Sequence, residues 1–283
     1  MLRVVIPAAG LGTRLLSATK EQPKEMLPLF ARDSKGARCL KPLVQLIFEQ
    51  LFMLGAREFC FIVGREKRML EDQFTPDEAY VTRLRQRGKR EEANELNDFY
   101  KKISASRIVW VNQSEPQGFG HAVLQSQPFT SGESFLVHAG DTFIVSKPPF
   151  TIEKMILTHA KATSDVTMLL REMRDPRQYG VAEITRGKRE LTVLRVVEKP
   201  LRPRSKFAIL PLYVFNASIF DALKHTSPDK RKELQLTDAI QRLIDDRRKV
   251  RAIKLRRDAI RLDIGTPETY WEALGLSYHL RLR

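Results

Sequence analysis

The sequence predicts an α/β fold with a mixed, mostly parallel central sheet flanked by helices. Residues 4–6 form a short apolar run that predicts a buried strand, and a glycine-rich loop follows it. A helical pattern over residues 43–54 closes at Gly55, and a second apolar run follows at residues 58–63. The opening is therefore a β–α–β unit. Such a unit implies parallel strands with a right-handed crossover, and a ligand site beyond the carboxyl ends of the strands.

Length and composition bound the class of protein. The chain has 283 residues, 42% hydrophobic and 29% charged, as in a globular protein with a large core. No apolar run approaches the roughly 20 residues that span a membrane, and the N-terminus lacks a signal-peptide pattern. Cys39 and Cys60 lack metal-site spacing, which suits a reducing compartment. We expect a single domain over residues 1–283, a cytoplasmic location and no membrane partner.

The chain is strongly basic, with a formal net charge of +15. Its lysines and arginines are spread over many segments, with few aromatic residues between them and no nucleic-acid-binding motif. We interpret most of them as solvated faces on a protein that handles anionic substrates. Nucleic acid is the less favoured partner.

The glycine-rich loop carries the first candidate site. Gly10 and Gly12 lack Cβ atoms, so the backbone can turn sharply and bring its N–H groups to a ligand. Arg14 and Lys24 add two positive charges nearby. Backbone donors with paired cations suit a polyphosphate. The alternative is an ordinary glycine turn with two surface cations.

Two familiar nucleotide motifs are incomplete here. The dinucleotide fingerprint needs a third glycine, but position 15 is Leu15, and its acidic residue after the second strand is missing from residues 63–65. A phosphate-binding loop of the Walker type needs Gly-Lys-Ser/Thr, which this stretch lacks. An NAD-dependent dehydrogenase is therefore disfavoured.

Two aspartates each follow an apolar strand. Asp141 comes after Gly140 at the end of the run over residues 134–139, and Asp263 ends a run that begins at Ile260. A strand-end carboxylate lies at the usual position of ligand-binding groups in this architecture. Taken alone, an aspartate there is more often a turn former.

The chain resembles the sugar-1-phosphate nucleotidylyltransferases, and among them the uridylyltransferases. The matching motifs occur in order from Val4 to about Tyr270, which makes them more specific together than any one alone. They are G-x-G-T-R at 10–14, P-K-x-x-L-P at 23–28, Gln113 and Gly118 before G-H-A at 120–122, Gly-Asp at 140–141, Y-G-V at 179–181, V-x-E-K-P at 196–200 and D-x-G at 263–265.

The resemblance implies a Rossmann-like nucleotide-diphospho-sugar transferase fold and uridylyl transfer from UTP to glucose 1-phosphate, giving UDP-glucose and pyrophosphate. It also implies Mg²⁺ as cofactor and a homo-oligomer, a dimer or tetramer. The site residues that it implies fall into four roles. They are Arg14 and Lys24 for catalysis; Ala9, Gly10, Gly12, Gln113 and Gly118 for the nucleotide; Gly180, Glu198 and Lys199 for the sugar phosphate; and Asp141 and Asp263 for the metal.

The implied reaction needs no general base, because the sugar phosphate is already a dianion at neutral pH. Alignment and charge neutralisation then carry the rate. We therefore assign no chemistry to His121 and expect it at a helix start or in packing. Without the resemblance, Gln113 is a polar loop residue and Glu198-Lys199 an ordinary strand exit.

Some positions depart from the family pattern. Thr142 stands where many uridylyltransferases have a second acidic residue, and Pro211-Leu212 replaces a common Gly-Arg. Residues 65–106 form a charge-rich helical insertion, with a lid or a partner surface as alternative roles. Transfer of thymidylyl or another nucleotidyl group, a different sugar 1-phosphate, and a non-catalytic sugar-nucleotide-binding protein all remain open.

Overall fold

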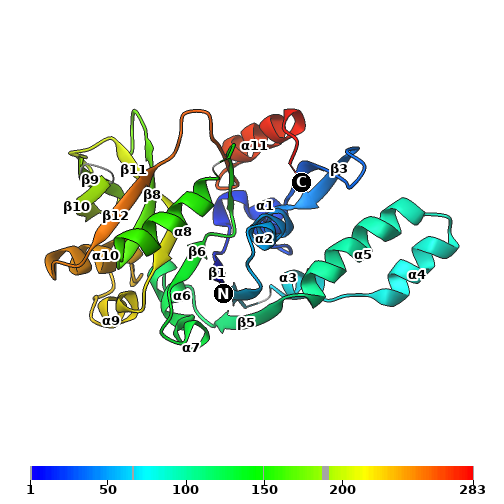
Figure 1. The fold of residues 1–283 in the computed structure, drawn as a ribbon, viewed down its shortest axis with the longest axis horizontal. Coiled ribbons are helices and arrows are strands. Elements are labelled where there is room, and N and C mark those ends of the chain that lie inside the picture. Colours follow the sequence, from blue (N-terminus) through cyan, green and yellow to red (C-terminus); the bar gives the residue numbers. More distant parts are fainter. Residues whose placement is uncertain (1, 66, 149, 187–190, 283) are drawn as a thin grey trace.

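The computed structural model describes residues 2–65, 67–148, 150–186 and 191–282, and its centre is a nine-stranded sheet with helices on both faces (Figure 1). Two small two-stranded sheets pair β2 (Pro28–Arg32) with β3 (Arg38–Pro42) and β7 (Thr142–Val145) with β13 (Ile260–Asp263). The order across the large sheet is β5 (Arg107–Gln113), β4 (Glu58–Gly64), β1 (Arg3–Ala8), β6 (Phe135–His138), β11 (Phe207–Phe215), β8 (Val166–Glu172), β12 (Val250–Lys254), β10 (Leu191–Val197) and β9 (Val181–Arg186).

Strand directions divide the large sheet. β5, β4, β1 and β6 run parallel to one another, and β8 runs parallel to β12. β11 is antiparallel to both β6 and β8, and β10 is antiparallel to β12 and β9. β11 also pairs antiparallel with β9 through Phe207 and Ala208. The described sheet is therefore mixed, as expected, with β10 and β11 running opposite to its other strands.

The predicted β–α–β unit is confirmed. β1 pairs with β4 in parallel, with Val5 beside Cys60, and α2 (Leu43–Met53) lies between them in sequence. Gly55 ends the helix with φ +92°, a conformation that glycine adopts without a Cβ clash. The β2–β3 hairpin between β1 and α2 was not predicted.

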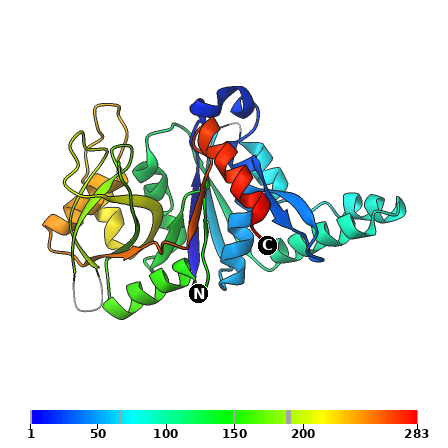
Figure 2. The same cartoon turned by 90° about the horizontal axis from the view of Figure 1, so that it is seen from above.

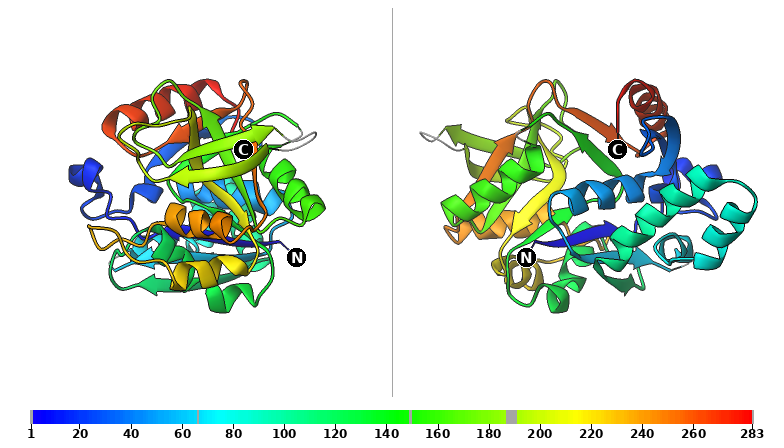
Figure 3. Two further views of the ribbon diagram at one scale, coloured as in Figure 1. Left: turned by 90° about the vertical axis from the view of Figure 1, so that its left-hand side faces the viewer. Right: turned by 45° about the vertical axis from the view of Figure 1, so that its right-hand side comes forward.

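The central strands carry apolar residues on both faces, so helices cover both faces of the sheet. Val4 and Ile6 of β1 face one core with α2, α8 (Thr151–Ala162) and α11 (Pro267–His279). Val5 faces the other core, with α6 (Phe119–Gln125), α9 (Ser218–Lys224) and α10 (Leu236–Asp245). α9 and α10 lie side by side, yellow and orange in the left panel of Figure 3. The short α7 (Gln127–Thr130) follows α6.

The charge-rich segment predicted over residues 65–106 is helical, as expected, where the structure describes it. It contains α3 (Arg68–Gln73), α4 (Glu78–Gln86) and α5 (Arg90–Ser104), and α4 packs on α5. The α4–α5 pair projects away from the sheet (Figures 1 and 2). Its buried side chains include Val81 of α4, and Phe99 of α5 contacts Phe48 and Phe74 of the core. Within the described residues, no helix combines the length and the apolar character needed to cross a membrane.

Candidate active site

The loop after β1 is held by a threonine. Gly12 has φ +66°, and a Cβ there would come within 3.1 Å of Thr19 Oγ1. That hydroxyl contacts the carbonyl oxygens of both Gly12 and Leu15 at 2.9 Å. The turn carries Arg14 in a 3-10 helix, η1 (Thr13–Leu15), and α1 (Leu16–Thr19) follows directly. The loop is thus fixed before any ligand binds.

Lys24 crosses this loop to reach Asp141. It begins a second 3-10 helix, η2 (Lys24–Met26), and its Nζ lies 2.5 Å from Asp141 Oδ2. A Cβ on Gly10 would sit 3.9 Å from Lys24 Nζ, so the ammonium lies against the bare backbone. Burial alone would lower the pKa of Lys24, but Asp141 and Glu25 keep that pKa above its usual value.

Asp141 and Asp263 are brought together by the small β7–β13 sheet. Asp263 pairs with Thr142, and the amide of Ile264 donates to the carbonyl oxygen of Asp141 at 3.0 Å. Thr142 Oγ1 lies 3.4 Å from Asp141 Oδ1 and 3.3 Å from Asp263 Oδ1. One hydroxyl proton can serve only one of these oxygens at a time. The two carboxylates therefore share a donor that cannot satisfy both.

The two carboxyl groups have opposite pKa shifts. Burial raises the pKa of Asp141, but Lys24 and then Arg261 outweigh it and leave that pKa below its usual value. Burial also raises the pKa of Asp263, and the charge of Asp141 adds to it, so that pKa stays high despite Arg261. A cation beside both carboxylates would relieve their repulsion.

This donor set fits a hard divalent cation. Asp141, Asp263 and the Thr142 hydroxyl offer oxygen atoms only. Among the described residues, no group of three or more His, Cys, Asp or Glu side chains is placed to hold a metal ion alone. Mg²⁺ commonly uses one or two carboxylates and takes its other ligands from water and substrate phosphates. Two carboxylates are therefore sufficient here.

Arg261 and Tyr179 complete the surroundings of Asp263. Arg261 Nη2 lies 2.7 Å from Asp263 Oδ1, and its Nη1 donates to the Tyr179 hydroxyl at 3.1 Å. The same guanidinium lies 5.3 Å from the centroid of the tyrosine ring. Arg261 was not predicted as a site residue, because an arginine in a basic chain gives no signal of what it faces.

Arg14 is the exposed cation of the site. A Cβ on Gly265 would lie 3.7 Å from Arg14 Nη2 and 3.1 Å from Asp263 Oδ2. The guanidinium therefore lies near Asp263, over the glycine of the D-x-G motif. Arg14 forms no ion pair within the described part of the chain. It is available to a bound anion.

A buried ion pair, Lys67 with Glu25, lies next to the candidate active site. Glu25 is 1% exposed, and Lys67 donates to its Oε2 at 3.1 Å and to the carbonyl oxygen of Ala8 at 2.5 Å. Burial raises the pKa of Glu25 and lowers that of Lys67. A Cβ on Gly140 would lie 3.1 Å from Glu25 Cγ. The pair therefore joins the end of β1 to the Gly140–Asp141 turn. Neither residue was predicted as part of the site.

Gln113 is buried at the end of β5, with its amide group held in place. Its Nε2 lies 2.8 Å from His121 Nδ1 and 3.4 Å from the carbonyl oxygen of Gly118. Burial lowers the pKa of His121, which favours the neutral ring. Its other nitrogen, Nε2, lies 3.0 Å from Gln125 Nε2, and a neutral ring accepts a hydrogen bond at only one of its two nitrogens. His121 lies in the first turn of α6, as expected for a helix-start position. It also orients Gln113, which was not expected.

The loop before α6 requires its glycines. Gly118 has φ +96°, and a Cβ there would meet the carbonyl oxygen of Leu234 at 2.9 Å; on Gly120 the distance would be 2.6 Å. Gly64 pairs with Gln113 between β4 and β5, and a Cβ on it would lie 3.1 Å from the carbonyl oxygen of Ala9. The loops after β1 and β5 therefore meet across the end of β4.

Gly180, Glu198 and Lys199 lie together as a second group. Thr237 Oγ1 donates to Glu198 Oε2 at 2.7 Å, and Lys199 Nζ lies 3.2 Å from Glu198 Oε1. A Cβ on Gly180 would come within 3.1 Å of Thr237 Oγ1 and 3.2 Å of Glu198 Oε2. The backbone N–H of Lys199 donates to the carbonyl oxygen of Tyr179. Tyr179 thus links this group to Arg261 and the aspartates.

Pro211 occupies an irregular point of β11. The pairing of β11 with β8 shifts register between Leu210 and Tyr213, and the carbonyl oxygen of Pro211 accepts from the amide of Ala139 at 3.0 Å. A bulge tolerates a residue without an N–H donor. This departure from the family pattern is accommodated locally.

A profile of the nucleotidyl transferase family matches residues 3–277. The chain belongs to this family. It is 36% identical over 242 residues to the UTP–glucose-1-phosphate uridylyltransferase YngB of Bacillus subtilis strain 168, covering 84% of this chain and 77% of that protein. The structure also resembles an apo UDP-glucose pyrophosphorylase, with TM-score 0.87, and a UDP-glucose pyrophosphorylase complexed with UDP-glucose, with TM-score 0.83. Both are 28% identical and are matched over 98% of each chain. The resemblance read from the sequence is confirmed.

Proposed function

We propose that this nucleotidyltransferase moves the uridylyl group of UTP to glucose 1-phosphate, giving UDP-glucose and pyrophosphate. The observation that carries the proposal is the cluster in which Lys24 and Thr142 contact Asp141 while Thr142 also reaches Asp263. The similarity to enzymes named for this reaction, one of them complexed with UDP-glucose, supports the choice of substrates.

In the reaction, a phosphate oxygen of the sugar 1-phosphate attacks the α-phosphorus of UTP. The bond from the α-phosphorus to the bridging oxygen breaks, and pyrophosphate leaves with the electron pair. Arg14, exposed and without a carboxylate partner in the described chain, neutralises the leaving pyrophosphate. Lys24, held at 2.5 Å from Asp141, neutralises charge around the α-phosphate. Both act by position and charge rather than by proton transfer.

Asp141 and Asp263 are the proposed ligands of Mg²⁺. When bound, the ion would supply positive charge between the two phosphate groups that must approach each other. Thr142, in place of a second acidic residue, hydrogen-bonds with these carboxylates. Arg261 and Tyr179 hold Asp263 in place.

The nucleotide would lie over the loops after β1 and β5. Backbone at Ala9, Gly10 and Gly12 would hold the phosphates and ribose, and Gln113 with Gly118 would read uracil. Because the Gln113 amide nitrogen is directed to His121 and Gly118, its oxygen is left to accept from the uracil N3–H. Cytosine has no hydrogen at N3 and would be rejected.

The sugar phosphate would lie beside Gly180, Glu198 and Lys199. The absence of a Cβ at Gly180 leaves the Glu198 carboxylate close to the backbone. Glu198 would accept from sugar hydroxyls, and Lys199 would neutralise the phosphate.

The test is pyrophosphate release with Mg²⁺ across UTP, dTTP, CTP, ATP and GTP, each paired with glucose 1-phosphate. We expect release with UTP well above CTP, ATP and GTP. Comparable release with dTTP would mean that the site ignores the 5-methyl group. Release only with another sugar 1-phosphate would correct the sugar, and no release with any pair would favour a non-catalytic sugar-nucleotide-binding protein.

A further inference from the structure

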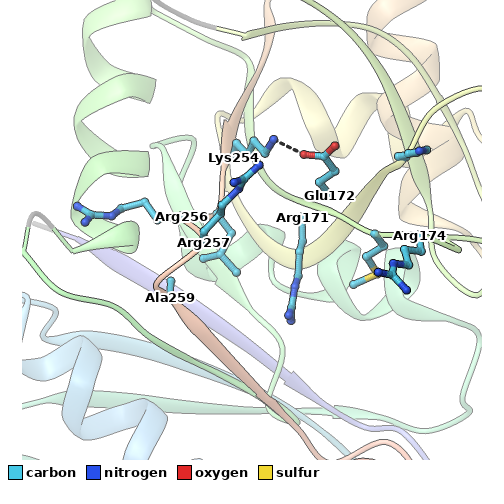
Figure 4. A pocket seen from close by; sticks show the side chains of 10 residues that line it. Arg171, Glu172, Arg174, Lys254, Arg256, Arg257 and Ala259 are labelled. Atoms are coloured by element: carbon cyan, nitrogen blue, oxygen red, sulfur yellow. Dashed lines mark hydrogen bonds and ion pairs between the residues drawn. The ribbon is translucent and has the colours of Figure 1, made fainter.

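A second charged hollow lies outside the candidate active site. It has a volume of about 390 Å³ and is bounded by the end of β8, the segment before β11 and the segment after β12 (Figure 4). Its cationic lining consists of six side chains, which we call the cation pocket: Arg171, Arg174, Lys206, Lys254, Arg256 and Arg257. None of the residues that line it was assigned to UTP, the sugar phosphate or the metal.

Most of this positive charge is unpaired. Glu172 is the acidic residue of the lining, and it is 2.5 Å from Lys254. Arg256 pairs with the neighbouring Asp258 at 2.8 Å. In the described chain, the remaining four cations form no ion pair; they are Arg171, Arg174, Lys206 and Arg257. Like charges gathered in this way repel one another, and Glu172, which also attracts Lys206 and Arg257, offsets only part of this repulsion.

The backbone around the cation pocket is tied together. The amide of Leu255 donates to the carbonyl oxygen of Leu170 at 2.7 Å, and that of Met173 donates to Lys206 at 2.9 Å. A further bond from Ala259 to Arg256, at 3.1 Å, closes the turn after β12. The three walls that carry the cations are therefore fixed relative to one another. The segments are therefore preorganised, and on binding it is chiefly the exposed Arg and Lys side chains that lose conformational entropy.

The side chains indicate the kind of ligand. Guanidinium groups without a carboxylate partner in the described chain come from two walls, Arg171 and Arg174 from one and Arg257 from the other. Guanidinium groups make paired hydrogen bonds to phosphate oxygens. The described lining has no aromatic side chain on which a base could stack, and its apolar members are Met173, Leu255 and Ala259. Recognition would therefore rest on phosphate groups rather than on a base.

We propose that the cation pocket binds a small molecule carrying two or more phosphate groups, through residues other than those proposed for the substrates. The volume admits a compact molecule, and the four unpaired cations match several negative charges. The pocket lies close to the candidate site along the chain, because Ala259 directly precedes β13, which carries Arg261 and Asp263.

The experiment is calorimetric titration of the whole chain with inorganic tripolyphosphate at about 0.15 M salt, where long-range electrostatics are screened. Tripolyphosphate can also enter the candidate active site, so Arg14→Ala/Lys24→Ala isolates binding at the cation pocket. In that background we expect Arg171→Ala/Arg257→Ala to weaken binding about tenfold or more.

The matched control is Arg85→Ala/Arg87→Ala, which removes the same charge from two exposed arginines of the α4 region. We expect it to change affinity less than about twofold at this salt concentration. Equal losses in the two double variants would mean a general field effect and would overturn the proposal. Unchanged affinity in Arg171→Ala/Arg257→Ala would overturn it as well.

Two further measurements distinguish ligand binding from a role of these arginines in folding or in nucleic-acid binding. Thermal unfolding without ligand should show Arg171→Ala/Arg257→Ala at least as stable as the parent, because repulsion is removed. A lower unfolding temperature would instead assign these arginines to the fold. A single-stranded oligonucleotide is the last probe. If it binds through the same arginines while tripolyphosphate does not bind, the pocket is a nucleic-acid site and the small-molecule proposal is overturned. None of these readouts depends on uridylyl transfer, so failure of that assay would leave them unaffected.

Discussion

The candidate active site and the cation pocket are both rich in charge, but they differ in how it is balanced. In the active site, Lys24 pairs with Asp141, Arg261 with Asp263 and buried Lys67 with Glu25. In the cation pocket, four of six cations have no carboxylate partner among the described residues. Paired charges hold one another in position before the substrate arrives. Unpaired positive charges can instead be neutralised by a bound anion.

Asp141→Asn should have the largest effect. The substitution keeps the shape of the side chain but removes the charge that pairs with Lys24 and would bind the metal. We expect turnover to fall about a thousandfold, with a change of less than about threefold in metal-free UTP affinity. Steady-state kinetics and calorimetry measure the two. Asp175→Asn, at an exposed carboxylate paired with Arg177, is the control. Equal losses in turnover and metal-free affinity would contradict the metal-ligand assignment.

Lys67→Met tests the paired charges beneath the site. It leaves the Glu25 carboxylate buried without its cation. We expect the free energy of unfolding in urea to fall by about 3 kcal/mol. Lys35→Met breaks an exposed pair with Glu91 and should leave the free energy of unfolding nearly unchanged, because solvent screens that pair. Similar values for the two variants would show that the buried pair is not a support.

His138 should make the free energy of unfolding depend on pH. Burial lowers its pKa to about 4, and within the described chain its Nε2 has no hydrogen-bond partner. Because this pKa is lower in the folded state, the native protein binds fewer protons, and stability falls as pH drops below about 6.5. We expect a loss of about 2 kcal/mol between pH 7 and pH 5 that His138→Gln removes. Arg171→Ala/Arg257→Ala should keep the parent's pH dependence, since arginine does not titrate there. Parallel urea curves for His138→Gln and the parent at both pH values would disprove this origin.

His121→Ala should change selectivity more than rate. Without the ring, the Gln113 amide loses the contact at 2.8 Å that fixes its orientation. The preference for UTP over CTP, measured as a ratio of kcat/KM values, should fall about tenfold, or about 1.4 kcal/mol. His225→Ala, at an exposed histidine after α9, should leave that ratio unchanged. An unaltered ratio in His121→Ala would mean that Gln113 is oriented by other contacts.

The sequence by itself determined the β–α–β opening, because hydrophobic periodicity and glycine breaks are local properties. It also singled out the loop around Gly10 and Gly12 and the two strand-end aspartates. It did not determine the direction of β11 or the β2–β3 hairpin, since strand pairing depends on partners far along the chain. The mixed sheet follows from those distant pairings.

Which polar residues meet depends on the tertiary structure. Glu25, Lys67 and Arg261 gave no signal in sequence, because a charged residue in a chain of net charge +15 looks the same whether it faces solvent or a carboxylate. The Y-G-V motif marked Tyr179 but not its contact with Arg261. The structure joins Asp141 to Asp263 through Thr142 and Gln113 to His121. It also gathers the cation pocket from three separate segments. Periodicity reports burial along one element, whereas these contacts depend on how distant elements pack, and that is fixed only when the chain has folded.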